Sequence, residues 1–229
     1  MKNPPNAAAV PVAATIAAPT LNEEAYRRLE EMIVTLDLAP GEVVSEAILS
    51  ALLGIGHTPI REALQRLARE HLVQILPRRG VIVTRVDVGL QLLVLETRRE
   101  LDRLIARAAV RRATVNERNQ FKSIAHAMAK AVRAGDMREF LRTDNAMNAA
   151  AGHAARNMVA ASTVATLHSV SRRFWYFHHA RYTDADETLR FHLALARTLA
   201  AGDEDTAARA SDALIDDLVA FARSTVTST

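Results

Sequence analysis

Residues 45–83 constrain the fold of this chain more than any other stretch, because two helix-forming segments flank a glycine-containing turn. Ser45 is a residue type that caps helix N-termini by accepting a backbone N–H. The apolar spacing that follows predicts a short helix whose buried side carries Leu49, Leu52 and Leu53. The tripeptide Gly54-Ile55-Gly56 then ends the helical pattern. The stretch therefore begins with a helix and a tight turn.

A second helix follows the turn, and Thr58 and Pro59 set its start. We expect Thr58 to be the N-cap and Pro59 to hold the first helical position, where a missing N–H costs nothing. The core-facing stripe of this helix comprises Ile60, Leu64, Leu67 and Leu72. Two β-type runs, Val73–Leu76 and Val81–Thr84, are then joined by residues 77–80. Helix, turn, helix and hairpin in this order predict a winged helix-turn-helix.

The polar side chains of this unit are of the types that DNA recognition uses. A recognition helix contacts base edges through its N-terminal turns, where arginine can read guanine with two hydrogen bonds. The hairpin tip offers guanidinium groups to phosphates or a minor groove, and a glycine there permits close backbone approach. The alternative is a solvated basic helix beside a turn. We expect the DNA-contacting residues to be His57, Thr58, Arg61, Gln65, Arg78, Arg79 and Gly80.

Residues 38–83 also resemble the N-terminal domain of the GntR family of bacterial transcription regulators. The resemblance is carried by Pro40-Gly41, Gly54, Thr58-Pro59, Arg61-Glu62-Ala63-Leu64 and Arg79-Gly80. It implies that a homodimer binds a double-stranded DNA operator with an inverted repeat. The chain has Gly56 where the family prefers serine and His57 where it prefers arginine. Because histidine lacks the permanent charge and the fork of arginine, we expect a different operator sequence or affinity.

The charge distribution agrees with this assignment, although the whole chain has a formal net charge of only +3. Residues 21–56 hold seven acidic and two basic residues, a net charge of −5. Residues 57–86 hold six basic and two acidic residues, a net charge of +4. The positive charge thus lies on the expected recognition helix and wing. The sequence has no cysteine, which excludes disulfides and thiolate metal sites and suits the reducing cytoplasm where we expect the protein.

The N-terminal boundary of the DNA-binding domain is expected near residue 20. Residues 1–19 are rich in alanine and proline, and we interpret them as a flexible tail rather than a signal peptide. Thr20 and Glu23 form a capping-box pattern that predicts a helix start. The core-facing residues of that helix are expected to be Tyr26, Leu29, Ile33 and Leu36. With the wing, it forms an expected domain over residues 20–86. We expect no membrane segment.

From about residue 90 the chain is expected to be all-α, because helical spacing recurs and strand signals are missing. The expected helices cover residues 92–112, 116–134, 137 to about 157, 159–182, 184–200 and 203–225. They predict a bundle of about six helices with its own core over residues 90–229.

Several polar residues lie on the apolar faces of these helices, at positions that project inward. Arg98, Asp144 and His192 belong to three different helices, and Asn148 follows Asp144 by one turn. A buried charge requires a partner or a ligand. These groups therefore either line a cavity or satisfy one another, for example through an Arg98–Asp144 ion pair. Arg172 lies in a stripe with His168, Trp175 and His179 that faces the cavity, a dimer partner or the core boundary. The candidate effector-binding residues are Arg98, Asp144, Asn148, Arg172 and His192.

The segment Arg98-x-x-Leu101-Asp102 resembles the start of the helical effector domain, of FCD type, in the FadR-like subgroup of the GntR family. Many of those domains bind a divalent metal through an aspartate and three histidines. Asp144 and His192 match two ligand positions, whereas Asn148 and Leu214 occupy the other two. The resemblance thus implies a degenerate site that holds a divalent metal only weakly. We expect no cofactor, and a small organic acid that contacts the protein directly.

These features predict a mainly α protein with a winged helix-turn-helix of three helices and a small β-hairpin wing, followed by the helical bundle. We interpret it as a ligand-responsive homodimeric transcription regulator, not an enzyme, whose bundle binds the effector and forms the dimer. One alternative is a TetR-like regulator, which the hairpin around residues 77–80 argues against. The other is a metal-dependent helical enzyme using Asp144 and His192, which no base, nucleophile or oxyanion set accompanies.

Overall fold

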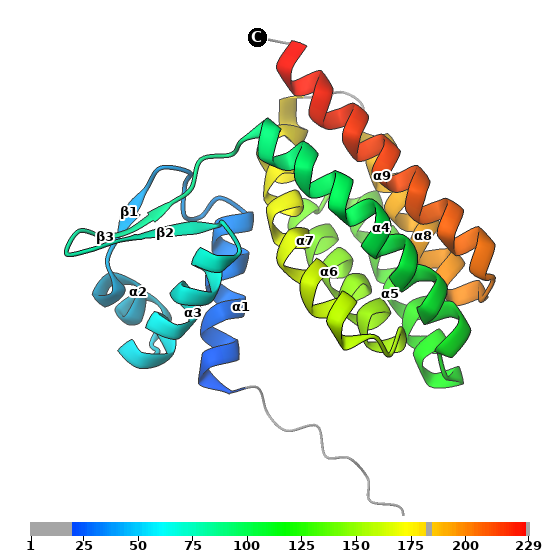
Figure 1. Ribbon diagram of the computed structural model, residues 1–229, viewed down its shortest axis with the longest axis horizontal. Helices are drawn as coiled ribbons and strands as arrows, with labels where there is room; N and C mark the ends of the chain where they lie inside the picture. The colour runs from blue at the N-terminus through cyan, green and yellow to red at the C-terminus, as the bar shows by residue number, and fades with distance from the viewer. Residues whose placement is uncertain (1–19, 182–184, 228–229) are drawn as a thin grey trace, which may run out of the picture.

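The N-terminal part of the molecule is a winged helix-turn-helix. The computed structural model describes residues 20–181 and 185–227, so the expected flexible tail of residues 1–19 lies outside it. Three helices and three short strands make up this part, which we call the head (Figure 1). In chain order they are α1 (Leu21–Val34), β1 (Val43–Val44), α2 (Glu46–Leu53), α3 (His57–Arg69), β2 (Val73–Leu76) and β3 (Gly80–Val83).

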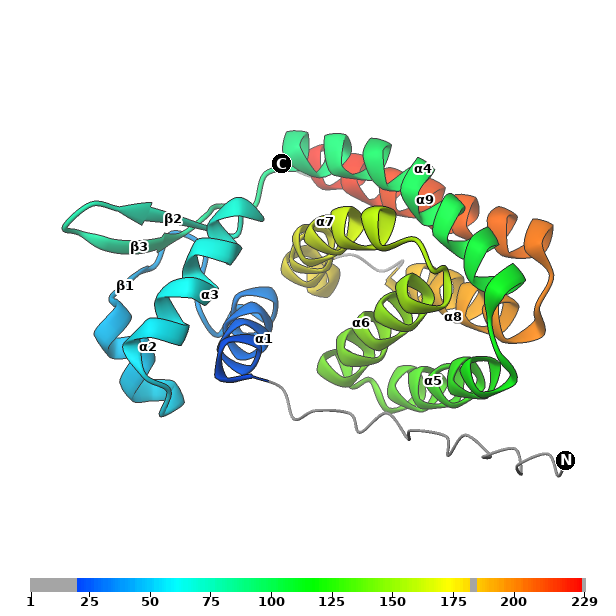
Figure 2. The ribbon, with the colours of Figure 1, turned by 60° about the horizontal axis from the view of Figure 1, so that its bottom comes forward.

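The rest of the described chain is a helical bundle, which confirms the predicted fold class. Its elements are α4 (Val88–Arg112), α5 (Val115–Ala134), α6 (Met137–Ala154), α7 (Met158–His178), a 3₁₀ turn (His179–Arg181), α8 (Ala185–Ala201) and α9 (Glu204–Thr227). Figure 2 shows α4 and α9 side by side, with α7 facing the head. The expected ends at residues 182 and 184 lie outside the described residues. None of the described helices is long and apolar enough to cross a membrane.

The start of α1 confirms the predicted capping box. The backbone N–H of Glu23 donates to the Thr20 hydroxyl over 3.2 Å, and the Glu23 carboxylate accepts from the Thr20 N–H over 3.0 Å. The placement of Leu36 was wrong, because α1 ends at Val34 and Leu36 has a φ of +63° beyond it. The side of α1 that is buried includes a carboxylate, Glu30, which apolar spacing does not reveal.

Helix α2 and the start of α3 correct three predictions. Thr58 is not the N-cap: α3 begins at His57 and Gly56 precedes it as the cap. Pro59 is the third residue of α3 and not the first, but it still lies in the first turn, where backbone N–H groups have no intrahelical acceptor. Leu52 is 57% exposed, since an eight-residue helix buries Leu49 and Leu53 one turn apart.

The wing is a three-stranded antiparallel sheet in the order β1-β3-β2, rather than a hairpin alone. Val43 and Val44 of β1 pair with Ile82 and Val81 of β3. Gly80 begins β3 with a φ of +98°, and a Cβ on it would lie 2.6 Å from the carbonyl oxygen of Val44. This glycine thus permits a close backbone approach to the protein's own β1, and its contact with DNA stays a prediction.

The head and the bundle contact each other through α1 and α7. Each has its own apolar cluster, and Val94 and Val170 of the bundle join the cluster of the head. Arg173 of α7 is buried and donates to the carbonyl oxygen of Leu72 over 3.3 Å and to the hydroxyl of Thr84 over 3.0 Å, at the base of the wing. Burial lowers the pKa of Arg173 to about 10. The bundle thus holds the head by polar contacts as well as by packing.

Candidate nucleic-acid interface and ligand cavity

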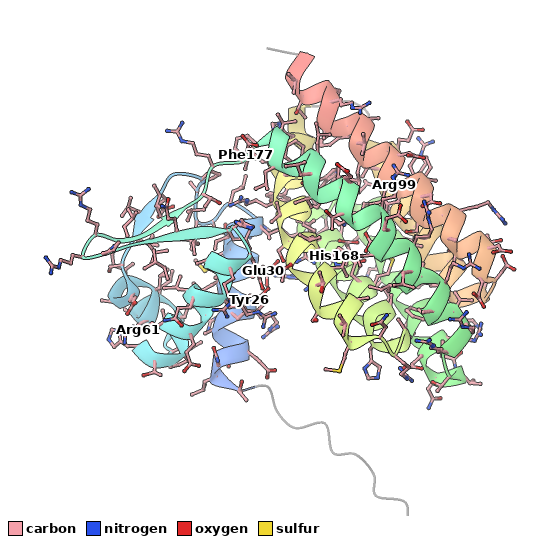
Figure 3. All side chains as sticks on the ribbon, viewed as in Figure 1. Tyr26, Glu30, Arg61, Arg99, His168 and Phe177 are labelled. Carbon is pink, nitrogen blue, oxygen red and sulfur yellow. The ribbon has the colours of Figure 1, made fainter. Side chains whose placement is uncertain are left out.

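The predicted DNA-contacting side chains lie on the outer surface of the head. His57, Thr58, Arg61 and Gln65 are exposed along α3, and Arg78 and Arg79 are exposed in the turn between β2 and β3. Figure 3 shows Arg61 on the part of the head that lies away from the bundle. Helix N-terminus and wing tip are thus both open to a duplex, whereas Gly80 is half-buried between strands.

Arg61 has a partner that the sequence analysis missed. Its Nε and Nη2 atoms donate to the carboxylate of Glu46 at the start of α2, over 3.1 and 2.8 Å. The hydrogen bonds with Glu46 raise the pKa of Arg61. This fork uses the Nε and Nη2 edge of the guanidinium near the start of α3, and Nη1 takes no part in it, so Arg61 can donate to a base edge while Glu46 orients it. The acidic first turn of α2 was the available signal.

The five candidate effector-binding residues surround one cavity inside the bundle. Arg98, Asp144, Asn148, Arg172 and His192 line it, together with His168, Ser171 and the rings of Phe140 and Trp175. They come from α4, α6, α7 and α8. The free volume is about 20 Å³, which holds roughly one water molecule.

Arg98 is neutralised by Asp102, and not by Asp144 as the alternative reading proposed. Its Nε donates to the Asp102 carboxylate over 3.0 Å, and His168 Nε2 lies 2.8 Å from the other carboxylate oxygen. Burial raises the pKa of Asp102, but Arg98 and His168 outweigh it and lower the pKa to about 2. Burial also lowers the pKa of His168, against the effect of Asp102. Arg98 and His168, which line the cavity, are therefore joined by Asp102 into one continuous Arg–Asp–His group.

His192 and Asp144 present two hydrogen-bond acceptors to the cavity. His192 Nδ1 lies 2.8 Å from the carbonyl oxygen of Thr188, so that nitrogen must carry the proton. In the neutral ring, the lone pair of Nε2 then faces Asp144 Oδ1 at 3.7 Å. Asn148 donates to the same oxygen over 3.2 Å. A hydrogen-bond donor or a cation fits between these acceptors.

The donor set does not form a complete metal site. Asp144 and His192 supply one carboxylate and one imidazole, whereas the amide of Asn148 bonds Asp144 and Leu214 is an apolar residue in the adjoining cavity. Within the described residues, no group of three His, Cys, Asp or Glu side chains is arranged to hold a metal. Two protein ligands are fewer than a tetrahedral zinc site uses.

Arg172 connects this cavity to the head. Its guanidinium lines the cavity and also donates to the Glu30 carboxylate of α1, to the Asn145 side chain, and to the Ser169 hydroxyl over 3.2 Å. Burial lowers the pKa of Arg172, but Glu30 and Asp144 outweigh it and raise the pKa above its usual value. Glu30 belongs to the head, and the sequence did not reveal its role because the inner face of α1 is otherwise apolar.

Comparisons with known proteins agree with both halves of this architecture. Residues 21–83 match the bacterial regulatory proteins of the gntR family, and residues 93–217 match the FCD domain. The chain is 26% identical to the HTH-type transcriptional repressor RspR of Escherichia coli, over 83% of each protein. It is 47% identical over 68 residues to an HTH-type transcriptional regulator of Streptomyces ambofaciens, over 30% of this chain and 29% of that protein. The structure of McbR/YncC from E. coli has the same fold, with a TM-score of 0.78 at 18% identity over 91% of this chain and 100% of that one.

Proposed function

Since the chain belongs to the GntR family of transcriptional regulators and carries an FCD domain, we propose that a small organic acid controls its affinity for an operator. The acid would bind in the cavity of the bundle. Residues 20–86 would form the DNA-binding domain, and residues 90–229 the effector-binding and dimerisation domain. A homodimer would read an inverted repeat, with one head on each half-site.

The convergence of polar groups around one cavity supports this proposal. Arg98 and Arg172 supply guanidinium groups that can fork onto a carboxylate. The paired acceptors of Asp144 and His192 fit a donor group on the same ligand. The rings of Phe140 and Trp175 make part of the wall apolar, and a less polar surrounding strengthens these contacts.

On the DNA side, we propose that His57, Thr58, Arg61 and Gln65 contact base edges or flanking phosphates, and that Arg78 and Arg79 contact phosphates or a minor groove. Their exposure on α3 and on the wing tip supports this assignment. Gly80 acts indirectly in this proposal, because it sets the path of β3 against β1.

Calorimetry on the full chain tests the effector class. Acetate, glycolate, succinate and citrate would each be titrated with and without EDTA. We expect at least one acid to bind with unchanged affinity in EDTA, because Asp144 and His192 are too few ligands for a required metal. Arg98→Lys keeps the charge beside Asp102 but removes the fork, so it should weaken that acid about tenfold. Arg99→Lys is the matched control, since Arg99 binds Asp216 on α9. Loss of binding in EDTA, or equal binding by both variants, would contradict the proposal.

A further inference from the structure

Arg172 is shared between the ligand cavity and the DNA-binding head. Its guanidinium contacts Glu30 of α1, and both side chains of this ion pair are 8% exposed. A buried arginine that loses its carboxylate partner is strongly disfavoured unless another anion replaces it. Figure 3 shows Glu30 on the part of α1 that faces α7 and its His168. Because Arg172 lines the cavity and Glu30 lies on α1, a ligand that changes the contacts of Arg172 also changes a contact that holds α1.

The cavity has no room for an organic acid in the conformation described. About 20 Å³ accommodates one water, whereas even acetate has four non-hydrogen atoms. A bound acid must displace side chains that line the cavity. The carboxylate of Glu30 is the group whose place at Arg172 an acid can take chemically, because it is itself a carboxylate.

The charged groups of the site point to the same exchange. The two arginines, Arg98 and Arg172, meet three carboxylates, those of Glu30, Asp102 and Asp144, so the carboxylates outnumber the guanidinium groups by one. Adding an anion to a buried group that already has more carboxylates than guanidinium groups is unfavourable. If the ligand replaces Glu30, the buried charge does not change, and the Glu30 carboxylate can move toward solvent with α1.

We propose that the carboxylate of the effector replaces the carboxylate of Glu30 at the Arg172 guanidinium. Ligand binding thus breaks the Glu30–Arg172 ion pair and releases α1 from the bundle in the same exchange. This mechanism rests on the proposed function, because it specifies how the binding of an acid in the cavity changes the contacts of the head. It assigns to Glu30 the role of an internal competitor of the effector.

A change at Glu30 reaches α3 through side chains on the same face of α1. Tyr26 lies one turn before Glu30, and its hydroxyl donates to Glu70 over 2.8 Å. Arg66 of α3 donates to the other oxygen of Glu70 over 3.1 Å, and its guanidinium lies 3.5 Å from the centre of the Tyr26 ring. Displacement of α1 therefore moves groups that are bonded directly to α3.

The experiment compares Glu30→Gln with Glu31→Gln on the full chain. Glu31 is the matched control, because it pairs with Arg142 of α6 but at the exposed edge of the interface. The dissociation constant of the tightest acid from the panel above would be measured with and without saturating operator DNA. Wild type should show at least a fivefold difference between the two constants. Glu30→Gln should bind the acid about tenfold more tightly without DNA and show a ratio near one, whereas Glu31→Gln should keep the wild-type ratio.

The outcomes separate the mechanism from the function. If Glu30→Gln keeps the wild-type ratio, the exchange is wrong although the protein is still an acid-responsive regulator. If neither wild type nor Glu30→Gln binds any acid of the panel, the proposed effector class and the exchange are both wrong. Should Glu30→Gln fail to fold, Glu30→Asp keeps the charge and shortens the reach, and it should lower the ratio. An unchanged ratio in Glu30→Asp would also overturn the exchange.

Discussion

Replacing Gly80 by alanine should destabilise the wing, because two separate costs fall on one residue. Its φ of +98° is a conformation that L-residues rarely adopt, which costs about 1–2 kcal/mol. The new Cβ would lie 2.6 Å from the Val44 carbonyl oxygen, so β1 must shift away from β3. Losing one or two backbone hydrogen bonds between Glu42, Val83 and their neighbours costs about 1–2 kcal/mol more. The expected total is about 3 kcal/mol.

Gly41→Ala separates these two costs. Gly41 has a φ of +88°, but a Cβ there meets no described atom within 4 Å. Its free energy of unfolding should therefore fall by the backbone cost alone, about 1–2 kcal/mol. Urea unfolding followed by circular dichroism measures both variants, and a fluorescent operator fragment reports DNA binding. Equal destabilisation of Gly80→Ala and Gly41→Ala would refute the role assigned to the contact between Gly80 and β1.

Three further predictions concern the two sites. Arg61→Ala should relax base preference at one position of each half-site. Arg79→Ala should weaken binding to all DNA sequences equally and reduce the dependence of log affinity on log salt concentration by about one per subunit. DNA titrations across a salt series distinguish the two variants. Asp102 has a pKa of about 2 in the folded protein, so its stabilisation of about 2 kcal/mol is present above its unfolded pKa and is lost as the pH falls toward 2. Urea titrations from pH 7 to 2.5 should show this loss in wild type and not in Asp102→Asn. Leu214→His combined with Asn148→His should tighten Ni²⁺ binding at least tenfold by calorimetry, since it restores the ligand types of the related metal sites.

Local patterns were sufficient for the helices and for β2 and β3 in their order, but not for β1. Thr20 and Glu23 satisfy each other within one turn, and β2 begins and ends where the run of β-type residues does. Spacing did not separate Leu52 from Leu53, because in the two turns of α2 both fit an apolar stripe almost equally well, and packing buries only Leu53.

The spacing of residues in the sequence did not predict which side chains and strands pair in the fold. The inward position of Arg98 was readable from its apolar neighbours, but its partner is Asp102 on the same helix rather than Asp144. Glu30 is 142 residues from Arg172, and the pairing of β1 with β3 joins segments that only the tertiary fold brings together. Glu30 and β1 give no local signal of their distant partners, whereas Arg98 and Asp102 are four residues apart on one helix, a spacing that the sequence does show.

The central claim is that an acid in the bundle changes the affinity of the head for its operator. An operator selected from random DNA by the full chain would be titrated with wild-type protein in EDTA, with and without saturating acid. We expect a footprint with two-fold symmetry, two chains per site, and an operator dissociation constant that the acid changes at least fivefold. An operator dissociation constant that saturating acid leaves unchanged would contradict the account.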